Sequence, residues 1–294
     1  MRVLLVGANG QTGDALRRSL APLGEVIATT RNGRLDDETG CEALDLADLD
    51  AISSLVARVR PDVIVNAAAY TAVDRAEDDV EAAFRINALA PGRLAEAAVA
   101  CGASLVHYST DYVFNGRGSR PYREDDATDP LGVYGRSKRD GELAINASGA
   151  RHLILRTAWV YGLHGHNFLR TMLRVGAERG ELRVVADQHG CPTPAWLIAD
   201  VTAGVLRKGI AESGIRHLVA SGQTTWHGFA EAIFDEASER GLIARRPIVT
   251  PIATADYPTR AVRPTYSVLD TTRLREEYAL DLPDWRDALA RTLA

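Results

Sequence analysis

The sequence predicts an α/β fold of the Rossmann type, in which a doubly wound parallel sheet carries helices on both faces and a smaller C-terminal substrate lobe follows. In the first half, short apolar runs rich in β-branched residues alternate with helical stretches, which is typical of a buried parallel sheet. A glycine-rich turn follows the first of these runs at 7–13. After about Trp159, long loops rich in glycine and proline replace the alternation. We therefore expect a sheet domain at 1–160 and a smaller lobe at 161–294, interleaved with the last strands of the sheet.

Apolar runs and amphipathic stretches predict the strands and helices in order along the chain. The strands expected in the first half are 3–6, 26–29, 43–45, 63–67, 104–109 and 152–156. The helices expected there are 11–20, 49–59, 80–101 and 134–145. In the second half we expect helices at 168–180, 195–209, 225–240 and 285–293, and one strand at 216–219.

Composition narrows the class of protein. The chain has 294 residues, and 34 Lys and Arg against 39 Asp and Glu give a net charge of −5, which argues against a nucleic-acid-binding surface. Its 46% of hydrophobic residues is too high for a disordered chain, and no stretch is apolar enough to span a membrane. Residues 1–6 run directly into the glycine-rich turn, which leaves no room for a signal peptide. The spacing of Cys41, Cys101 and Cys191 fits neither a disulfide framework nor a zinc site, so we expect a cytoplasmic protein.

A strand, a glycine-rich turn and a helix follow one another at the start of the chain, an order that binds the diphosphate of a dinucleotide. Gly7, Gly10 and Gly13 would allow a tight turn, close approach of the phosphates and close packing of the helix on the strand. The residues between them that would line the phosphates are Asn9, Gln11 and Thr12. The spacing G-x-x-G-x-x-G differs from the more frequent G-x-G-x-x-G, and a glycine-rich turn without a ligand is the alternative.

The end of the second strand indicates which dinucleotide binds. Many NAD-binding proteins place an acid there for the ribose hydroxyls, whereas this chain has Arg31, whose guanidinium would pair with the 2′-phosphate of NADPH. We therefore expect NADPH, with NADH as a second cofactor that the protein also accepts; an exposed loop arginine is the alternative. Further cofactor contacts are expected from Asp45, Leu46, Ala67, Ala68 and Ala69.

Tyr134 and Lys138 are four residues apart and so share one face of a predicted helix. A phenol with a pKa of about 10 is a poor acid–base group at neutral pH, and a neighbouring ammonium lowers that pKa. Thr110, at the end of a predicted parallel strand, would hydrogen-bond the reacting oxygen. These three residues are the expected catalytic group, with Tyr134 and Lys138 also touching the cofactor. A surface tyrosine beside a solvated lysine is the alternative.

Together these motifs resemble the extended short-chain dehydrogenase/reductase family. Within it, the resemblance to reductases of nucleotide sugars covers nearly the whole chain. The runs that carry it are Asn66 to Asp74, His107 to Phe114, Arg156 to Tyr161, Leu218 to Trp226, Tyr257 to Thr259, Arg263-Pro264 and Leu282 to Trp285. The resemblance implies that NADPH delivers hydride to C4 of dTDP-4-dehydro-L-rhamnose to give dTDP-L-rhamnose, the last step of dTDP-rhamnose synthesis, with the smaller lobe binding the nucleotide sugar.

The resemblance also assigns residues to the sugar. The expected substrate-binding residues are Val73, Thr110, Asp111, Trp159 and Arg263. For Trp159 there is an independent argument, since an indole can cover the apolar face of a sugar, although core packing is the alternative. A guanidinium such as Arg263 would hold the diphosphate, and the neighbouring Arg260 is either a second such group or solvated.

One departure from the family concerns a metal. Some members are described as dimers bridged by magnesium through glutamates, but Ala15 and Trp196 stand at two of those positions and provide no oxygen ligand. We expect no metal and either a monomer or a weak homodimer, with no nucleic-acid or membrane partner. Two other functions remain open: a related nucleotide-sugar epimerase or dehydratase, and a non-catalytic NADP-binding regulatory subunit.

Overall fold

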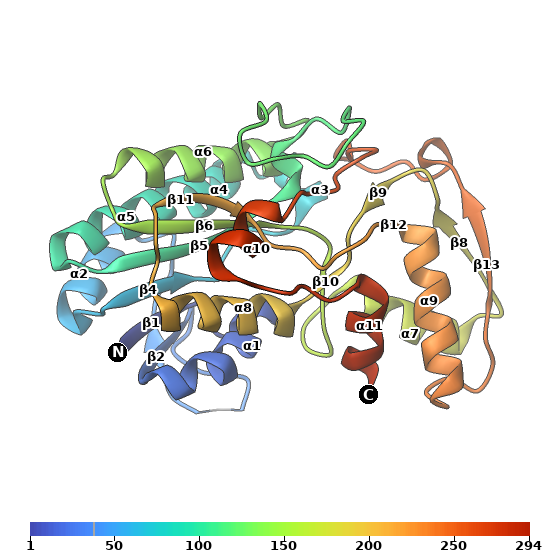
Figure 1. Cartoon of the computed structure of the whole chain (residues 1–294), viewed down its shortest axis with the longest axis horizontal. Coiled ribbons are helices and arrows are strands. Elements are labelled where there is room, and N and C mark those ends of the chain that lie inside the picture. Colours follow the sequence, from blue (N-terminus) through green and yellow to red (C-terminus); the bar gives the residue numbers. More distant parts are fainter. Residues whose placement is uncertain (38) are drawn as a thin grey trace.

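The computed structural model describes residues 1–37 and 39–294, and it is built around one parallel sheet (Figure 1). Within these residues, seven strands pair in the order β11-β6-β5-β4-β1-β2-β3, with every pair parallel. The strands are β1 Arg2–Val6, β2 Glu25–Thr30, β3 Glu42–Ala43, β4 Val63–Asn66, β5 Ser104–Thr110, β6 His152–Thr157 and β11 Gly214–His217. Strand order reverses direction between β1 and β4, which confirms the predicted doubly wound Rossmann-type fold.

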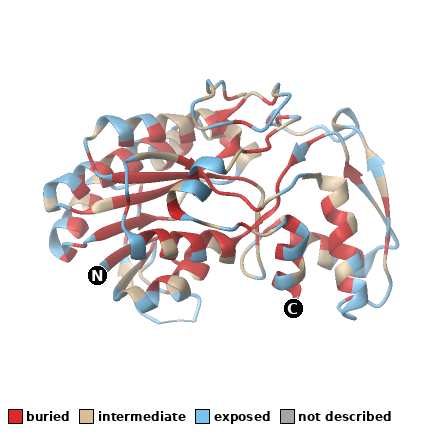
Figure 2. Ribbon diagram, in the orientation of Figure 1, coloured by how far each residue is buried: buried red, intermediate tan, exposed pale blue. Residues whose placement is uncertain are grey.

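Helices cover both faces of this sheet. One face carries α2 (Leu49–Val59), α5 (Ala90–Cys101) and α6 (Val133–Ala147), and the other carries α1 (Gln11–Leu20) and α8 (Ala195–Lys208) (Figure 1). The central strands are buried on both sides, and red ribbon therefore runs through the middle of the sheet in Figure 2. This burial explains why the strands are apolar throughout and do not alternate.

The turn between β1 and α1 has the tight geometry that its glycines predict. Gly7 has a φ of +84°, and a Cβ there would lie 2.8 Å from Ala68 on the segment that follows β4. A Cβ on Gly13 would overlap the carbonyl oxygen of Gly7. The helix therefore starts as close to the strand as two backbones allow, which a side chain at either position would prevent.

The second half forms a smaller lobe beside the sheet (Figure 1). Its strands pair in twos as β7 with β10, β9 with β12, and β8 with β13. These strands are β7 Val160–Tyr161, β8 Glu181–Val185, β9 His189–Gly190, β10 Thr193–Pro194, β12 Thr224–Thr225 and β13 Ile248–Ile252. Its helices are α7 Phe168–Glu178, α9 Trp226–Glu239 and α11 Trp285–Leu293, while α10 (Thr272–Tyr278) packs on β11 at the edge of the main sheet (Figure 1). Because α8 and β11 return to the sheet, the two halves of the chain are interleaved; the boundary at residue 160 stays a prediction.

The expected helix at 80–101 contains a wide turn. The chain runs through α4 (Val80–Phe84), a π-helical turn at Arg85–Leu89, and then α5. The extra residue directs Asn87 inward, where its side chain exchanges hydrogen bonds of 2.8 and 3.0 Å with the backbone of Tyr70. Such turns occur often beside functional sites, and this one fixes the loop that follows β4, together with the short helix α3 (Val73–Ala76).

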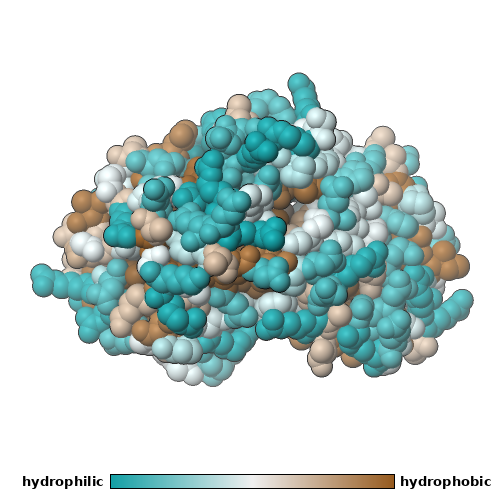
Figure 3. Space-filling model, viewed as in Figure 1, coloured by the Kyte–Doolittle hydropathy of each residue, from teal (hydrophilic) through white to brown (hydrophobic). Residues whose placement is uncertain are grey.

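The face of the molecule shown in Figure 3 is mostly hydrophilic, as the charged and polar residues of the sequence lead one to expect, with apolar residues scattered over it. Among the described residues, no helix combines the length and the apolar character that crossing a membrane requires.

Gly13→Ala should destabilise the protein by several kcal/mol, because the new methyl group cannot enter the space taken by the Gly7 carbonyl oxygen without moving α1. Gly204→Ala is the matched control, since Gly204 lies within α8 and a Cβ there meets nothing within 4 Å. That change should stabilise the helix by about 0.5–1 kcal/mol. Denaturant unfolding measures both, and equal stabilities of the two variants would contradict the packing described.

Candidate active site

A cavity of about 760 Å³ lies at the carboxyl ends of the central strands, where ligands bind in open α/β sheets. Sequence-predicted cofactor residues line it from several elements, namely Gly7, Asn9, Gly10, Gln11, Thr12, Arg31, Asp45, Leu46, Ala67, Ala68, Ala69, Tyr134 and Lys138. Gly13 does not line the cavity but sets the approach of α1 to β1. The structure thus brings the predicted cofactor residues into one space.

The end of this cavity at the start of α1 fits a diphosphate. Gly10 is the N-cap residue of α1 and offers no side-chain hydrogen bond to the helix, so the first backbone N–H groups are left to an anion. Oε1 of Gln11 is buried without a hydrogen-bond partner among the described residues. A polar atom in that state is ordinarily matched by a bound ligand or water. These observations fit the dinucleotide that the sequence predicts.

A loop of the smaller lobe covers this turn. His164 Nε2 lies 3.0 Å from the carbonyl oxygen of Asn9 and 3.2 Å from an Asp36 carboxylate oxygen. Gly165 has a φ of +73° and packs on the side chain of Gln11. His164 therefore caps the phosphate-binding turn, while His166 lines the cavity.

The other end of the cofactor cavity holds Arg31. It follows β2, is exposed to solvent and lines the cavity together with Thr30 and Asn32. The Thr30 hydroxyl donates toward the carbonyl oxygen of Arg34 at 2.9 Å and so shapes this loop. An exposed guanidinium at the rim is available to a phosphate that enters from solvent.

Lys138 is almost fully buried, with 2% of its surface exposed. Its ammonium donates to the carbonyl oxygen of Tyr108 at 2.6 Å, and its Nζ lies 3.1 Å from Nε2 of His107. Burial lowers the pKa of Lys138 to about 8, although the nearby carboxylate of Glu142 acts in the opposite direction. A lysine with such a pKa exchanges its proton near neutral pH.

Tyr134 lies one helical turn from Lys138 and is in contact with Tyr112, the two rings meeting edge to face at 5.7 Å. Burial raises the pKa of Tyr134 above its ordinary value, and a hydrogen bond with the side chain of Thr110 opposes that rise. Burial thus outweighs the lowering expected from Lys138, whose Nζ contacts His107 and the Tyr108 carbonyl instead. The lowering stays a prediction for the protein with cofactor bound. A raised pKa keeps the phenol protonated, which is the form that donates a proton.

Thr110 and Asp111 end β5 beside this phenol. The Thr110 hydroxyl donates to the Asp111 carboxylate at 3.1 Å and accepts a hydrogen bond from the backbone N–H of Tyr112 at the same distance. Asp111 is 1% exposed, and burial raises its pKa to about 6. These two residues therefore present a polar end to an otherwise enclosed site.

Two hydroxyl groups in the cavity were not among the predicted site residues. Ser109 and Thr157 end β5 and β6, line the cavity, and have buried hydroxyl oxygens without a partner among the described residues. Their positions at the carboxyl ends of parallel strands were the signal that would have identified them.

Trp159 lies where the sheet passes into the smaller lobe. Its backbone has a φ of +47°, which is rare outside glycine. Its ring stacks on that of Trp226 with centroids 3.6 Å apart, and a Cβ on Gly190 would meet the same ring at 2.5 Å. The structure thus gives Trp159 a packing role between the lobes, and its contact with a sugar stays a prediction.

Arg263 is engaged by neighbouring groups. Its guanidinium donates to the Asp74 carboxylate at 2.7 Å and to the Tyr112 hydroxyl at 3.0 Å, and Arg260 pairs with Asp78. These contacts fasten the 257–264 loop to α3, where Val73 is half-buried at the first position. Binding of a diphosphate by Arg263 therefore stays a prediction, and it would require a ligand to share or replace the Asp74 contact.

The residues in place of the family's metal ligands have other contacts. Ala15 is buried in α1, and Trp196 donates through Nε1 to the Thr292 hydroxyl at 2.9 Å beneath the guanidinium of Arg291. Among the described residues, no group of three or more His, Cys, Asp or Glu side chains is placed to hold a metal ion.

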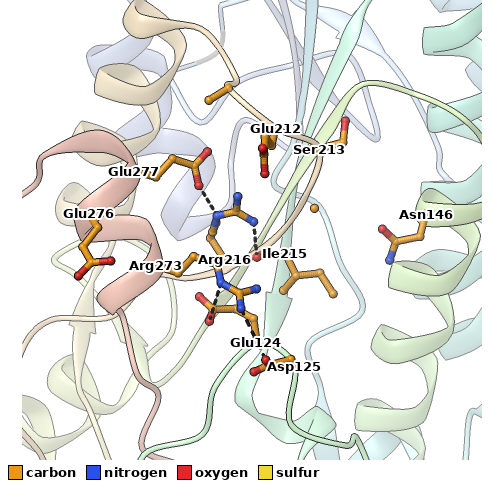
Figure 4. Close-up of a pocket in the computed structure, with 12 residues that line it drawn as sticks. Glu124, Asp125, Asn146, Glu212, Ser213, Ile215, Arg216, Arg273, Glu276 and Glu277 are labelled. Atoms are coloured by element: carbon orange, nitrogen blue, oxygen red, sulfur yellow. Dashed lines mark hydrogen bonds and ion pairs between the residues drawn. The ribbon is translucent and has the colours of Figure 1, made fainter.

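A second hollow, of about 770 Å³, lies at the β11 edge of the sheet, away from the glycine turn (Figure 4). The two guanidinium groups in the hollow lie near carboxylates that also line it. Arg216 pairs with Glu277, and the Arg273 guanidinium lies 3.9 Å from a Glu124 carboxylate oxygen and 3.7 Å from one of Asp125. With five carboxylates against these two guanidinium groups, the hollow is an acidic surface, and it brings together none of the predicted site residues.

Comparison with known proteins identifies the family of this chain. The family model described as RmlD substrate binding domain matches residues 1–294. The chain belongs to this family. It is 45% identical over 296 residues to the dTDP-4-dehydrorhamnose reductase of Escherichia coli K12, covering 100% of this chain and 97% of the relative. It is 47% identical over 300 residues to the reductase of the same name from Burkholderia thailandensis, covering 98% and 97%.

Solved structures agree with the family assignment. A dTDP-4-dehydrorhamnose reductase from Bacillus anthracis in complex with NADP superposes with a TM-score of 0.90 at 34% identity, covering 99% of this chain and 98% of that one. The resemblance found in the sequence is thereby confirmed, and members of the RmlD substrate binding domain family share the whole fold described above.

Arg31→Ala should lower kcat/KM for NADPH by about 10- to 100-fold while changing the value for NADH little, because a charge-assisted contact to the 2′-phosphate is worth about 1.5–3 kcal/mol. Steady-state kinetics with both cofactors measure the ratio. Arg17→Ala, on α1 and paired with Asp37, is the control. A wild type that prefers NADH, or an equal loss with both cofactors, would contradict the assignment.

Proposed function

We propose that this chain is an NADPH-dependent oxidoreductase that reduces the C4 keto group of dTDP-4-dehydro-L-rhamnose to give dTDP-L-rhamnose, the last step of dTDP-rhamnose synthesis. The observation that carries the proposal is that Tyr134 and Lys138 line the same cavity as the phosphate-binding turn, with Thr110 hydrogen-bonded to Tyr134. It is supported by full-length matches to dTDP-4-dehydrorhamnose reductases, one of them solved with NADP.

Each residue of the site has a separate role in the reaction. NADPH, when bound along the cavity from Gly10 to Lys138, supplies the hydride. Tyr134 holds its proton at neutral pH because burial raises its pKa, and it donates that proton to O4 as negative charge develops there. Thr110 positions the phenol and the reacting oxygen, and Lys138, which lines the cavity beside Tyr134, would hold the nicotinamide ribose.

The nucleotide sugar would occupy the side of the site that faces the smaller lobe. Asp111 supplies a polar contact beside Thr110, Trp159 an aromatic face and Val73 an apolar one. Arg263 would meet the diphosphate. These assignments rest on the family resemblance, and two contacts support them: Asp111 is hydrogen-bonded to Thr110, and Arg263 contacts Tyr112, whose ring meets that of Tyr134.

Tyr134→Phe should reduce kcat by about 10²- to 10⁴-fold, because it removes the proton donor and leaves the fold intact. NADPH oxidation with dTDP-4-dehydro-L-rhamnose measures the loss, and fluorescence titration should show NADPH binding unchanged. Tyr278→Phe is the control: Tyr278 is on α10, outside the cavity, and its hydroxyl accepts from the backbone N–H of Ala211. Turnover of this variant should stay near that of the wild type.

The same assay separates the alternatives. An epimerase or dehydratase would convert nucleotide sugar without net consumption of NADPH, whereas a reductase oxidises one NADPH for each sugar. Wild-type protein that binds NADPH, fails to oxidise it and forms a stable complex with another protein would instead be a regulatory subunit and would refute the reductase.

We also propose that the protein works in the cytoplasm as a monomer or weak homodimer without a bridging metal. The support is its use of NADPH, its three free thiols and the replacement of two family ligands by Ala15 and Trp196. Sedimentation velocity should give the same oligomeric state with added magnesium and with chelator. Dimers that form only with magnesium would contradict this.

A further inference from the structure

Three buried side chains form a row behind the catalytic tyrosine: Asn66 at the end of β4, His107 in β5 and Lys138 on α6. Each is at most 2% exposed. Nδ2 of Asn66 lies 3.1 Å from Nδ1 of His107, and Nε2 of His107 lies 3.1 Å from Nζ of Lys138. The row thus crosses from one strand through its neighbour to the helix that carries Tyr134.

The direction of hydrogen bonding along the row is set at its Asn66 end. The backbone N–H of Ala68 donates to Oδ1 of Asn66 at 3.2 Å, so this oxygen cannot exchange places with Nδ2 without setting two donors against each other. Nδ2 therefore points at His107 and donates to Nδ1. A neutral imidazole that accepts at Nδ1 carries its hydrogen on Nε2.

His107 is held neutral, since burial and the charge of Lys138 lower its pKa well below the ordinary value. Its Nε2–H is consequently aimed at Nζ of Lys138. An ammonium has three hydrogens and no lone pair, so it sets donor against donor across this 3.1 Å contact. An amine has a lone pair and accepts the hydrogen bond, so the count of donors and acceptors favours the amine.

Other groups around Lys138 balance this preference. The Tyr108 carbonyl accepts from Nζ in either form, and the Tyr134 phenol beside it is uncharged. Glu142, on the same helix, favours the ammonium, but its carboxylate is paired at 2.7 Å with Arg156 of β6. Lys138 is thus held between its two forms by partners on three strands and its own helix.

We propose that Asn66 and His107 are positioning residues that make the proton of Lys138 labile, so that Lys138 can reprotonate Tyr134 after each reduction. In that step an N–H bond of Lys138 breaks and the O–H bond of Tyr134 forms again, and solvent returns a proton to the amine once the product has left. The proposal rests on the reductase function proposed above.

Asn66→Asp tests the proposal because a carboxylate accepts from Nδ1–H and so moves the imidazole hydrogen to Nδ1. Nε2 then accepts from the ammonium. The basic limb of the kcat profile, expected near pH 8 in the wild type, should rise by at least about one pH unit, since the ammonium gains a hydrogen bond that it lacked. An unchanged basic limb would overturn the proposal.

The control separates this effect from simple attraction between the new carboxylate and Lys138. In a His107→Leu background, Asn66→Asp should move the basic limb less than it does with His107 in place, because only the longer-range attraction between the new carboxylate and the ammonium is left; the four proteins form a double-mutant cycle. A shift of equal size with and without His107 would show a direct charge effect and refute the role of the imidazole.

A second measurement does not depend on turnover. In protein labelled with ¹⁵N-histidine, the ring nitrogen shifts report which nitrogen carries hydrogen, and the spectrum of His107→Leu identifies the His107 signals. The wild type should show hydrogen on Nε2, and Asn66→Asp should move it to Nδ1. Hydrogen on Nδ1 in the wild type would overturn the proposal, whereas absence of NADPH oxidation with hydrogen on Nε2 would refute the reductase function alone.

Discussion

The contact between α6 and the carboxyl end of β5 is the constraint on which the site depends, because it buries a lysine beside a phenol. Two glycines let the helix approach: a Cβ on Gly135 would overlap the Tyr112 carbonyl, and one on Gly141 the carbonyl of Asn87 in the π-helical turn. Burial removes water from the Lys138 ammonium, which donates instead to the Tyr108 carbonyl at 2.6 Å. The lost hydration costs free energy that only close hydrogen-bond partners can offset. The same approach places Tyr134 against Thr110 and keeps its proton in place.

The remaining parts of the molecule extend outward from that contact. On one side, the Gly7 turn packs closely on the segment at Ala68, and both line the cavity together with Tyr134 and Lys138 of α6. On the other side, the smaller lobe meets the sheet through the Trp159–Trp226 stack and through His164 on the phosphate-binding turn. A sugar that enters between the lobes would therefore meet a cofactor already held by the sheet. The fold thus determines where the cofactor and the sugar bind, and a few side chains carry out the chemistry.

Sequence periodicity predicted the elements whose signals are local. Three helices have the predicted bounds, Gln11–Leu20, Leu49–Val59 and Trp285–Leu293; the second is capped by Asp48, whose side chain accepts from two N–H groups of the first turn. The paired strands β8 and β13 were not predicted, because exposed and buried positions are mixed in them without a regular alternation. The π-helical turn and the Asn66–His107–Lys138 row depend on contacts between distant segments. The glycine turn and the Tyr–Lys pair were found because each needs a short, fixed spacing.

Transfer of deuterium tests the central claim most directly. The protein is incubated with dTDP-4-dehydro-L-rhamnose and NADPH that carries deuterium at both C4 positions of the nicotinamide, and the product is examined by proton NMR and mass spectrometry. The account predicts one deuterium in each product molecule, located at C4 of the sugar, and none when Tyr134 is replaced by Phe over the same time. Product that carries no deuterium, or deuterium at another carbon, would contradict it.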